Sequence, residues 1–378
     1  MPDVAIVGAG LIGAGIAYEL AQRGASVTLF DRAEPARAAS WAGAGMLAPF
    51  SEELPDAAML ALCRASLALY PEFVADLHER SGVDAKLLAC GTLHVALDDV
   101  ALEHTRANAR TYATNGGDVR LLDRAEMVAR EPALARDVRG GAFIANEAQV
   151  DNRRLGRALI AACERMGVRL ERTRTLAIEA DARRVRGIRT AHGFVAATTI
   201  VNAAGAWAGD IAGVPDEARV PVFPVAGEML AIAVPPHIAR ALLWLEHTYL
   251  VPRDDGRLLV GATVRERGFD VTVSAAGIRD LLANALRVAP VLGTFAIVET
   301  WAGLRPGTPD KRPFIGATPV DGYFVAAGHY RNGILLTPIT ARAIADLITC
   351  GDTDIPLDGF GVGRETPERP LDLANVAR

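Results

Sequence analysis

Three glycines near the start of the sequence have the types and spacing of a dinucleotide-binding turn. They lie in Gly8-Ala9-Gly10-Leu11-Ile12-Gly13, and Asp31 follows Gly13 at about the 20-residue interval that such turns require. Gly8 permits the tight turn, Gly10 lets the backbone approach a pyrophosphate, and Gly13 lets the following helix pack closely. A carboxylate at position 31 can accept a hydrogen bond from a ribose 2'-hydroxyl. These residues predict binding of FAD or NAD, in preference to NADP.

The segments around these glycines must form a strand, a helix and a second strand if they are to hold a cofactor. Residues 4–7 are wholly apolar, apolar residues recur at helical spacing from residue 11 to residue 24, and residues 26–30 form a second apolar run. The glycine pattern alone has low specificity, because a glycine-rich loop that binds nothing has the same letters. Here the strand, the helix and the downstream acid agree, so the segment is interpreted as a nucleotide-binding βαβ unit.

Three polar side chains in the second half of the sequence are candidates for holding a substrate. Tyr249 begins a strand-like run, Arg305 lies in an apolar neighbourhood next to proline and glycine, and Arg331 lies in a glycine-bounded turn. A buried arginine needs an anionic partner, which is either a bound anion or an acidic side chain of the same protein. The residues alone leave both possibilities open. Residues 40–49 are small, which suits a backbone that lies against a flat ring, although an ordinary loop has the same composition.

Composition and charge argue against several classes of function. The 378 residues carry a formal charge of -5, from 40 basic and 45 acidic residues, so no basic excess is available to bind a nucleic acid. The four cysteines are far apart and include no Cys-x-x-Cys pair, which indicates neither a disulfide framework nor a zinc site; we expect no metal. The apolar run near the start is too short to cross a membrane. We expect a cytoplasmic protein without a membrane span.

The pattern along the chain predicts the α/β class, α+β overall, with a Rossmann-like cofactor-binding domain and an inserted antiparallel β-rich substrate-binding domain. Residues 220–300 are β-rich with one helix near 276–288, whereas residues 200–207 and 323–327 are typical of strands that return to the cofactor-binding sheet. A helix over 334–348, broken early by Pro338, should follow. The cofactor-binding domain is assigned to 1–85, 146–220 and 305–365, the substrate-binding domain to 86–145 and 221–304, and a C-terminal tail to 366–378. The cleft between the domains is the expected ligand site.

Several motifs resemble those of one enzyme family. Besides the glycine turn they are Ala44-Gly45-Met46-Leu47, Tyr249-Leu250-Val251-Pro252-Arg253, Gly261-Ala262-Thr263, Trp301-Ala302-Gly303-Leu304-Arg305-Pro306-Gly307-Thr308 and Gly328-His329-Tyr330-Arg331-Asn332-Gly333-Ile334-Leu335-Leu336. In this order, over nearly the whole chain, they are similar to motifs of the D-amino-acid oxidase family of FAD enzymes, and within it to the glycine oxidases of bacterial thiamine biosynthesis. The motif around His329 is far more specific than the glycine turn.

The resemblance implies FAD-dependent oxidative deamination of glycine and other small amines or D-amino acids, such as sarcosine and D-alanine. A hydride would pass from the substrate Cα to flavin N5, and O2 would reoxidise the flavin and form H2O2. The imine would give glyoxylate or another 2-oxo acid and ammonia, or be handed over to a thiazole synthase. The FAD would be noncovalent and the protein a homo-oligomer, a tetramer by resemblance.

The resemblance also implies the site residues. Tyr249 and Arg305 would hold the substrate carboxylate, where a guanidinium suits bidentate binding, and Arg331 would add positive charge beside it. Met46, Ala48, His247 and Val264 would border the substrate, with a structural role for His247 as the alternative. The small side chains at 48 and 264 predict room for larger amines. The cofactor-binding set comprises Gly8, Gly10, Leu11, Ile12, Gly13, Asp31, Arg32, Ser40, Gly45, Met46, Leu176, Ala204, Gly205, Trp207, His329, Arg331, Asn332, Gly333, Ile334 and Leu335.

Other functions remain as alternatives. Sarcosine or D-amino-acid oxidases and dehydrogenases have this architecture, but the sarcosine oxidases resemble a pattern with a flavin-linked cysteine and a nearby lysine. No cysteine lies between Cys163 and Cys350, and the only lysines, Lys86 and Lys311, lie outside the corresponding β-rich segment. A flavin domain that acts on modified tRNA has the same fold, and the acidic balance argues against it. A nucleotide-binding protein without catalysis has no use for an arginine and a tyrosine matched to a carboxylate.

Overall fold

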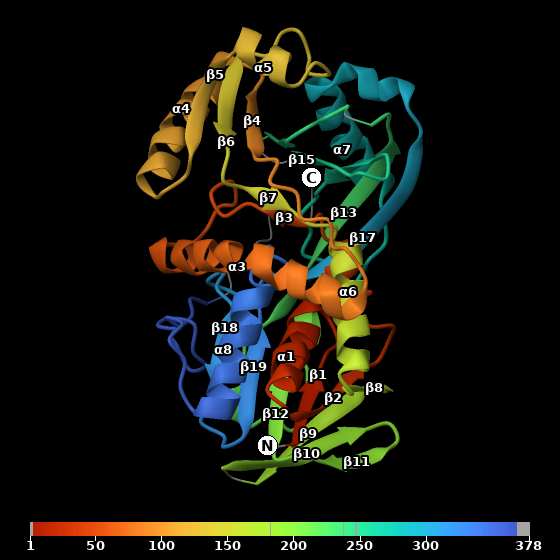
Figure 1. The fold of residues 1–378 in the computed structure, drawn as a ribbon, viewed down its shortest axis with the longest axis vertical. Coiled ribbons are helices and arrows are strands. Elements are labelled where there is room, and N and C mark those ends of the chain that lie inside the picture. Colours follow the sequence, from red (N-terminus) through yellow and green to blue (C-terminus); the bar gives the residue numbers. More distant parts are fainter. Residues whose placement is uncertain (1–2, 182, 237, 246–247, 369–378) are drawn as a thin grey trace.

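The computed structural model describes residues 3–181, 183–236, 238–245 and 248–368, and two large sheets divide its length (Figure 1). The first is a six-stranded sheet in the order β18-β19-β12-β1-β2-β8. Its strands are parallel except β18, which runs antiparallel to β19. The strands are β1 (Asp3–Val7), β2 (Ser26–Asp31), β8 (Arg169–Arg172), β12 (Thr199–Asn202), β18 (Phe314–Ala317) and β19 (Tyr323–Ala327).

The central strands are apolar on both faces, so both faces are covered: helices pack on one face, and strands of the 175–190 region pack on the other. Val4 to Val7 of β1 are all buried. α1 (Leu11–Gln22) packs between α6 (Asn152–Arg165) and α8 (Thr337–Cys350), as Figure 1 shows. The approach of α1 to α8 is close at Gly15, where an added Cβ would lie 3.1 Å from Cγ2 of Thr337. A small residue is therefore required on this helix face.

The second large sheet has eight strands in the order β17-β13-β16-β15-β14-β4-β6-β5. The predicted antiparallel arrangement holds for every neighbouring pair except β14 and β4, which are parallel. The strands are β4 (Thr92–Ala96), β5 (Val119–Asp123), β6 (Gly140–Ile144), β13 (Phe223–Ala233), β14 (Leu242–Leu245), β15 (Thr248–Pro252), β16 (Arg257–Gly261) and β17 (Ile297–Gly307). Helices α4 (Asp99–Thr114), α5 (Arg124–Arg130) and α7 (Ala275–Val288) accompany it.

Smaller elements complete the fold. A three-stranded sheet contains β9 (Thr175–Asp181), β10 (Arg184–Thr190) and β11 (Gly193–Ala196), and a two-stranded one joins β3 (Met46–Leu47) to β7 (Ala148–Gln149). Helix α2 (Ala39–Ala42) and 3-10 turns at Gly205–Trp207, Asp216–Ala218 and Pro290–Thr294 link the larger elements. The α/β class with several sheets is confirmed, whereas the domain boundaries stay a prediction.

The last helix differs from what its sequence suggests. The last helix begins at Thr337, so Pro338 lies in its first turn and does not break it. The prediction of a start at residue 334 was wrong because 333–336 form turns instead. A proline is tolerated in the first turn because its missing N–H would have no partner within the helix. Among the described helices, α3 (Ala57–Ser81) alone is long and apolar enough to span a membrane by length and composition, and its Tyr70 and Leu77 are fully buried in the core.

Candidate active site

A deep cavity lies where the two large sheets meet. It holds about 1130 Å³, including its open mouth. The glycine turn and α1 border it on one side, the 39–48 segment forms a wall, and strands β13, β15 and β17 form the opposite side. The 329–334 turn closes the remaining edge. Segments that are far apart in the sequence thus form one site.

The glycine turn has the geometry that a pyrophosphate requires. Gly8 has φ +104°, and a Cβ there would lie 2.4 Å from the carbonyl oxygen of Ala203. A Cβ at Gly13 would lie 1.9 Å from the carbonyl oxygen of Gly8. Gly10, the N-cap of α1, has no side-chain cap and lines the cavity. The positive end of the α1 dipole therefore faces the space in which a phosphate would bind.

Two polar side chains hold the turn in place. The carboxylate of Asp31 accepts hydrogen bonds from the backbone N–H of Ala9, at 2.9 Å, and from that of Ala33, at 3.0 Å. Ser40 Oγ accepts a 3.0 Å hydrogen bond from the N–H of Leu11. Asp31 thus lies beside the turn, where a carboxylate has remaining lone pairs for a ribose hydroxyl.

The substrate end of the cavity is defined by Arg305 and Tyr249, and each of them lies over a glycine. A Cβ at Gly227 would lie 2.2 Å from Nη1 of Arg305, and a Cβ at Gly261 would lie 2.6 Å from the Tyr249 ring. The guanidinium is fixed by a 3.1 Å hydrogen bond from Nη1 to the carbonyl oxygen of Thr263. Neutral acceptors leave its charge uncompensated, so it suits a carboxylate. Burial raises the pKa of Tyr249, so its hydroxyl stays a donor at neutral pH.

Arg331 is also in the cavity, but it has an acidic partner. Its Nε donates to Oε2 of Glu52 at 2.6 Å, and its Nη2 lies 3.3 Å from Oε1. Burial alone would lower the pKa of Arg331, but the charge of Glu52 raises it above its ordinary value. The ion pair neutralises the second arginine, so the expected excess positive charge from Arg331 is reduced. Among the described residues that line the cavity, Arg305 is therefore the one cation without an acidic partner.

A buried polar cluster holds the segment that carries Glu52. The carboxylate of Glu147 accepts hydrogen bonds from the N–H of Phe50 at 2.7 Å, the N–H of Ser51 at 2.9 Å and the hydroxyl of Ser51 at 2.6 Å. The Ser51 hydroxyl also lies 2.8 Å from Nε2 of His94. Burial raises the pKa of Glu147 and lowers that of His94 to about 4. The cluster thus fixes the backbone next to Glu52.

The 329–334 turn brings a neutral histidine to the cofactor side. His329 is buried, its Nε2 lies 3.1 Å from Oγ1 of Thr340, and burial lowers its pKa to about 3. The turn residues Asn332, Gly333 and Ile334 line the cavity. Their backbone precedes α8 directly, so its dipole points toward this edge.

A second, wider cavity shares Glu52, Tyr249, Tyr330 and Arg331 with the first. It holds about 3040 Å³ including open solvent, and Val264 lines it. Trp244 lies beside Tyr249, with ring centroids 5.8 Å apart. The two cavities therefore meet at these four residues.

The predicted site residues separate into three groups. Those that line the first cavity are Gly10, Leu11, Ile12, Ser40, Gly45, Met46, Ala48, Gly205, Tyr249, Arg305, His329, Arg331, Asn332, Gly333 and Ile334. Those outside its lining are Gly8, Gly13, Asp31, Arg32, Leu176, Ala204, Trp207, Val264 and Leu335. Arg32 stacks on Trp207, with Cζ 3.8 Å from the ring centroid, and Leu176 is exposed on β9. His247 lies outside the described residues.

Some residues of the site gave little or no signal in the sequence. Glu52 stands in a short acidic run that is typical of a solvated surface, and its partner Arg331 is 279 residues away. Gly227 and Gly261 are important only because large side chains of other residues lie over them. The sequence offers only an indirect signal for these two positions, since a glycine inside a strand often marks a place where another group approaches the backbone closely.

These observations fit an FAD. The N-terminus of α1, whose N-cap residue Gly10 has no capping side chain, can bind the pyrophosphate, and Asp31 can bind a ribose hydroxyl, while the small residues of the 42–45 segment leave space for a flat ring. Arg305 and Tyr249 lie in the same cavity as this segment. The geometry can therefore accommodate a cofactor and a carboxylate in one cavity.

Comparisons with known proteins agree with this geometry. Residues 3–347 match the family model DAO, described as FAD dependent oxidoreductase. The chain is 40% identical over 356 residues to the bifunctional protein ThiO/ThiG of Synechocystis sp., with 92% of this chain and 51% of that protein covered. It is 36% identical to the glycine oxidase of Geobacillus kaustophilus, and the match covers 96% of this chain and 97% of that protein. The crystal structure of glycine oxidase from that organism has a TM-score of 0.91, at 35% identity, and the match covers 97% of this chain and 100% of that chain. The chain spans about half the length of the ThiO/ThiG relatives it matches.

Proposed function

This chain belongs to the DAO family of FAD-dependent oxidoreductases, and we propose that it is an oxidase of glycine and other small amino acids. The observation that carries the proposal is the position of Arg305 and Tyr249 at one end of the cavity. There an uncompensated guanidinium and a phenol donor converge on the place of a carboxylate. The similarity to proteins named glycine oxidase supports glycine as the substrate.

The side chains of this site bind and orient the substrate. Arg305 pairs with the carboxylate and Tyr249 donates a hydrogen bond to it, which fixes the direction of the substrate Cα. Met46 and Ala48 on the 46–48 wall limit the size of the substituent, and Val264 borders the approach from the second cavity. Because the side chains at 48 and 264 are small, we expect sarcosine and D-alanine to be oxidised too. Turnover of glycine alone would refute this. The chemistry that a bound FAD would supply is acceptance of a hydride from the substrate Cα and transfer of the two electrons to O2, which with two protons would yield H2O2.

The experiment that tests the proposal is an absorbance spectrum of the purified protein. Under anaerobic conditions glycine should bleach the oxidised flavin band, and air should restore it with formation of peroxide, glyoxylate and ammonia. A flavin band that no small amino acid bleaches would refute the proposed oxidase activity. Reduction by glycine without reoxidation in air would indicate a dehydrogenase instead.

The binding mode of the flavin has its own test. We propose that the FAD is noncovalent, because none of the residues that line the first cavity is a cysteine. Acid precipitation should therefore leave all the yellow colour in the supernatant. Colour that remains with the precipitated protein would contradict this.

The product and the assembly are further parts of the proposal. We propose that the imine product is used for thiazole formation in thiamine biosynthesis; relatives of this chain that form part of a longer bifunctional protein support this. A homotetramer in the cytoplasm is proposed by resemblance. Sedimentation of the purified holoprotein would test the oligomeric state.

A further inference from the structure

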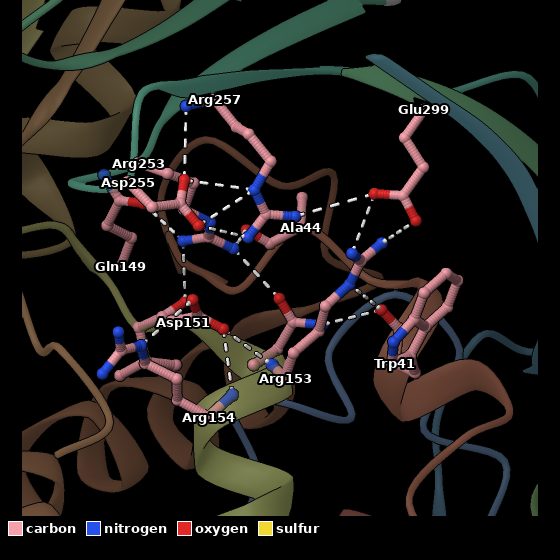
Figure 2. A network of polar contacts seen from close by, with 12 residues as sticks. Trp41, Ala44, Gln149, Asp151, Arg153, Arg154, Arg253, Asp255, Arg257 and Glu299 are labelled. Carbon is pink, nitrogen blue, oxygen red and sulfur yellow. Dashed lines mark hydrogen bonds and ion pairs between the residues drawn. The ribbon is translucent and has the colours of Figure 1, made fainter. Parts of the chain in front are cut away.

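Arg253, directly after β15, makes four hydrogen bonds across the junction of the two large sheets. Its Nη1 donates to Oε1 of Gln149 at 2.7 Å and to the carbonyl oxygen of Val150 at 2.9 Å. Its Nη2 donates to the carbonyl oxygen of Ala44 at 2.7 Å and to Oδ1 of Asn152 at 3.0 Å. Burial lowers the pKa of Arg253 to about 10, so it remains charged at neutral pH. Figure 2 shows this guanidinium at the centre of a polar network.

One of the four acceptors, Ala44, belongs to the 39–48 segment that forms the wall of the cofactor cavity, and the other three lie in the 149–152 segment that pairs with this wall. Ala44, Gly45 and Met46 line that cavity. The N–H of Val150 donates to the carbonyl oxygen of Gly45 at 2.9 Å, and Nη2 of Arg253 would be 2.9 Å from a Cβ at Gly45. One guanidinium therefore fixes both backbone segments that meet at this point.

Asn152 extends the network to the cofactor end of the site. Its Nδ2 donates to the carbonyl oxygens of Ser40, at 2.7 Å, and Trp41, at 3.1 Å. Ser40 in turn accepts from the N–H of Leu11, at the start of α1. An unbroken chain of hydrogen bonds thus leads from Arg253 to the turn at which the pyrophosphate would bind.

A second set of contacts anchors the same wall to β17. Arg153 pairs with Glu299 through Nη1 at 2.9 Å and Nη2 at 3.1 Å, and its Cζ lies 3.7 Å from the Trp41 ring centroid, as Figure 2 shows in part. Trp301 Nε1 donates to the carbonyl oxygen of Ala42 at 2.9 Å. The 40–46 segment therefore takes its shape from the eight-stranded sheet.

We propose that Arg253 is a positioning residue for the cofactor, which holds residues 40–46 in the shape that walls the FAD cavity and aligns Ser40 with the glycine turn. A planar guanidinium donates to four oxygens in fixed directions, whereas a lysine ammonium has three donors on a flexible stem. The inference rests on FAD binding, which is part of the proposed function. Arg253 would act on the cofactor indirectly, through the backbone of Ala44 and the side chain of Asn152 that it holds in place.

Dissociation of FAD from the holoprotein tests the proposal. Each purified variant is diluted, and the rise in flavin fluorescence gives the dissociation constant; the thermal midpoint is measured separately in excess FAD. Arg253→Met should raise the FAD dissociation constant by about tenfold or more, the effect of one lost charge-assisted bond. Arg253→Lys should bind FAD more tightly than Arg253→Met but less tightly than the wild type, because a lysine ammonium cannot reach all four oxygens.

Two further variants separate positioning from stability. Asn152→Asp keeps an acceptor for Arg253 but removes both donors to Ser40 and Trp41, so it should weaken FAD binding without a matching loss of thermal midpoint. Arg364→Met is the control: Arg364 is a partly buried arginine that pairs with Asp310 at 2.8 Å and makes no hydrogen bond to residues 40–46. It should lower the thermal midpoint and leave the FAD dissociation constant within twofold.

The outcomes distinguish this inference from the proposed function. If glycine bleaches the wild-type flavin but Arg253→Met and Asn152→Asp release FAD as the wild type does, Arg253 is only structural and the inference is wrong. If Arg253→Met does not fold, Arg253→Lys and Asn152→Asp decide by the same readout. A wild type that holds no flavin overturns the proposed function and this inference with it.

Discussion

Alanine at position 227 should weaken binding of an amino-acid substrate while the protein stays folded. A Cβ at Gly227 would lie 2.2 Å from Nη1 and 2.6 Å from Cζ of Arg305. Ordinary contact begins at about 3.5 Å, so Nη1 must move by roughly 1.3 Å. Because the guanidinium is the end of a flexible side chain, it can move at little cost in stability. If Arg305 holds the substrate carboxylate as proposed, we expect this move to misalign the guanidinium with it.

The size of the effect follows from the bonds that are lost. A hydrogen bond to a charged group contributes about 1.5–3 kcal/mol, so the loss of one bond of a bidentate pair lowers affinity by about 10- to 150-fold. The assay is anaerobic reduction of the flavin at increasing glycine concentration, which gives the substrate affinity and the limiting rate separately. We expect the affinity to fall by this factor and the thermal midpoint to change by only a few degrees.

Two controls make the reasoning refutable. Gly361→Ala tests the effect of an added methyl group alone, because a Cβ there meets nothing within 4 Å. In an Arg305→Met background Gly227→Ala should have no further effect on affinity, since the side chain that it displaces is absent. An unchanged affinity in Gly227→Ala, or an equal further loss in the double variant, would show that Arg305 does not hold the carboxylate.

Two other predictions concern the charges around the cavity. Glu52→Gln leaves Arg331 without its anionic partner, so it should lower the free energy of unfolding by about 2 kcal/mol and tighten binding of a carboxylate inhibitor. Denaturant titration measures the first effect and inhibitor titration the second. Weaker inhibitor binding would contradict the prediction. His94 has its pKa lowered by burial to about 4 from 6.5, so below pH 6.5 the unfolded state takes up a proton that the folded state does not. The free energy of unfolding should therefore fall by as much as about 3 kcal/mol between pH 6.5 and pH 4, and His94→Gln should flatten this part of the profile.

Local patterns in the sequence were sufficient for much of the fold. The strand, turn and helix around Gly8 to Gly13 form as expected, because apolar periodicity and glycine spacing are local signals. Arg305, Tyr249 and Arg331 were expected in one cleft, and the structure brings them to one cavity. The parallel pairing of β14 with β4 was not expected, because pairing of strands about 150 residues apart leaves no local pattern.

The chemistry around the site was less accessible from the sequence. An arginine in an apolar segment implies a partner, but the sequence alone does not show whether that partner is a ligand or a side chain. The structure separates the two cases: Arg331 pairs with Glu52, whereas Arg305 donates to the carbonyl oxygens of Ala226 and Thr263 and has no acidic partner among the described residues. Arg253 was part of a recognised motif without a role, because its four acceptors come from segments about 100 and 200 residues away.

The strand order of the six-stranded sheet has a consequence for how the chain is made. β1 has β2 on one side and β12 on the other, where Thr199 pairs with Val4. The other edge of β12 stays unpaired until β19 has been synthesised, because Tyr323 of β19 pairs with Ile200 of β12. At about 5–20 residues per second, ribosomal synthesis separates β1 from β19 by roughly 15–60 s. During that time the nascent chain exposes unpaired strand edges and the apolar face of α1. We expect newly made chains to need protection from aggregation, and cooler, slower expression to raise the yield of folded protein.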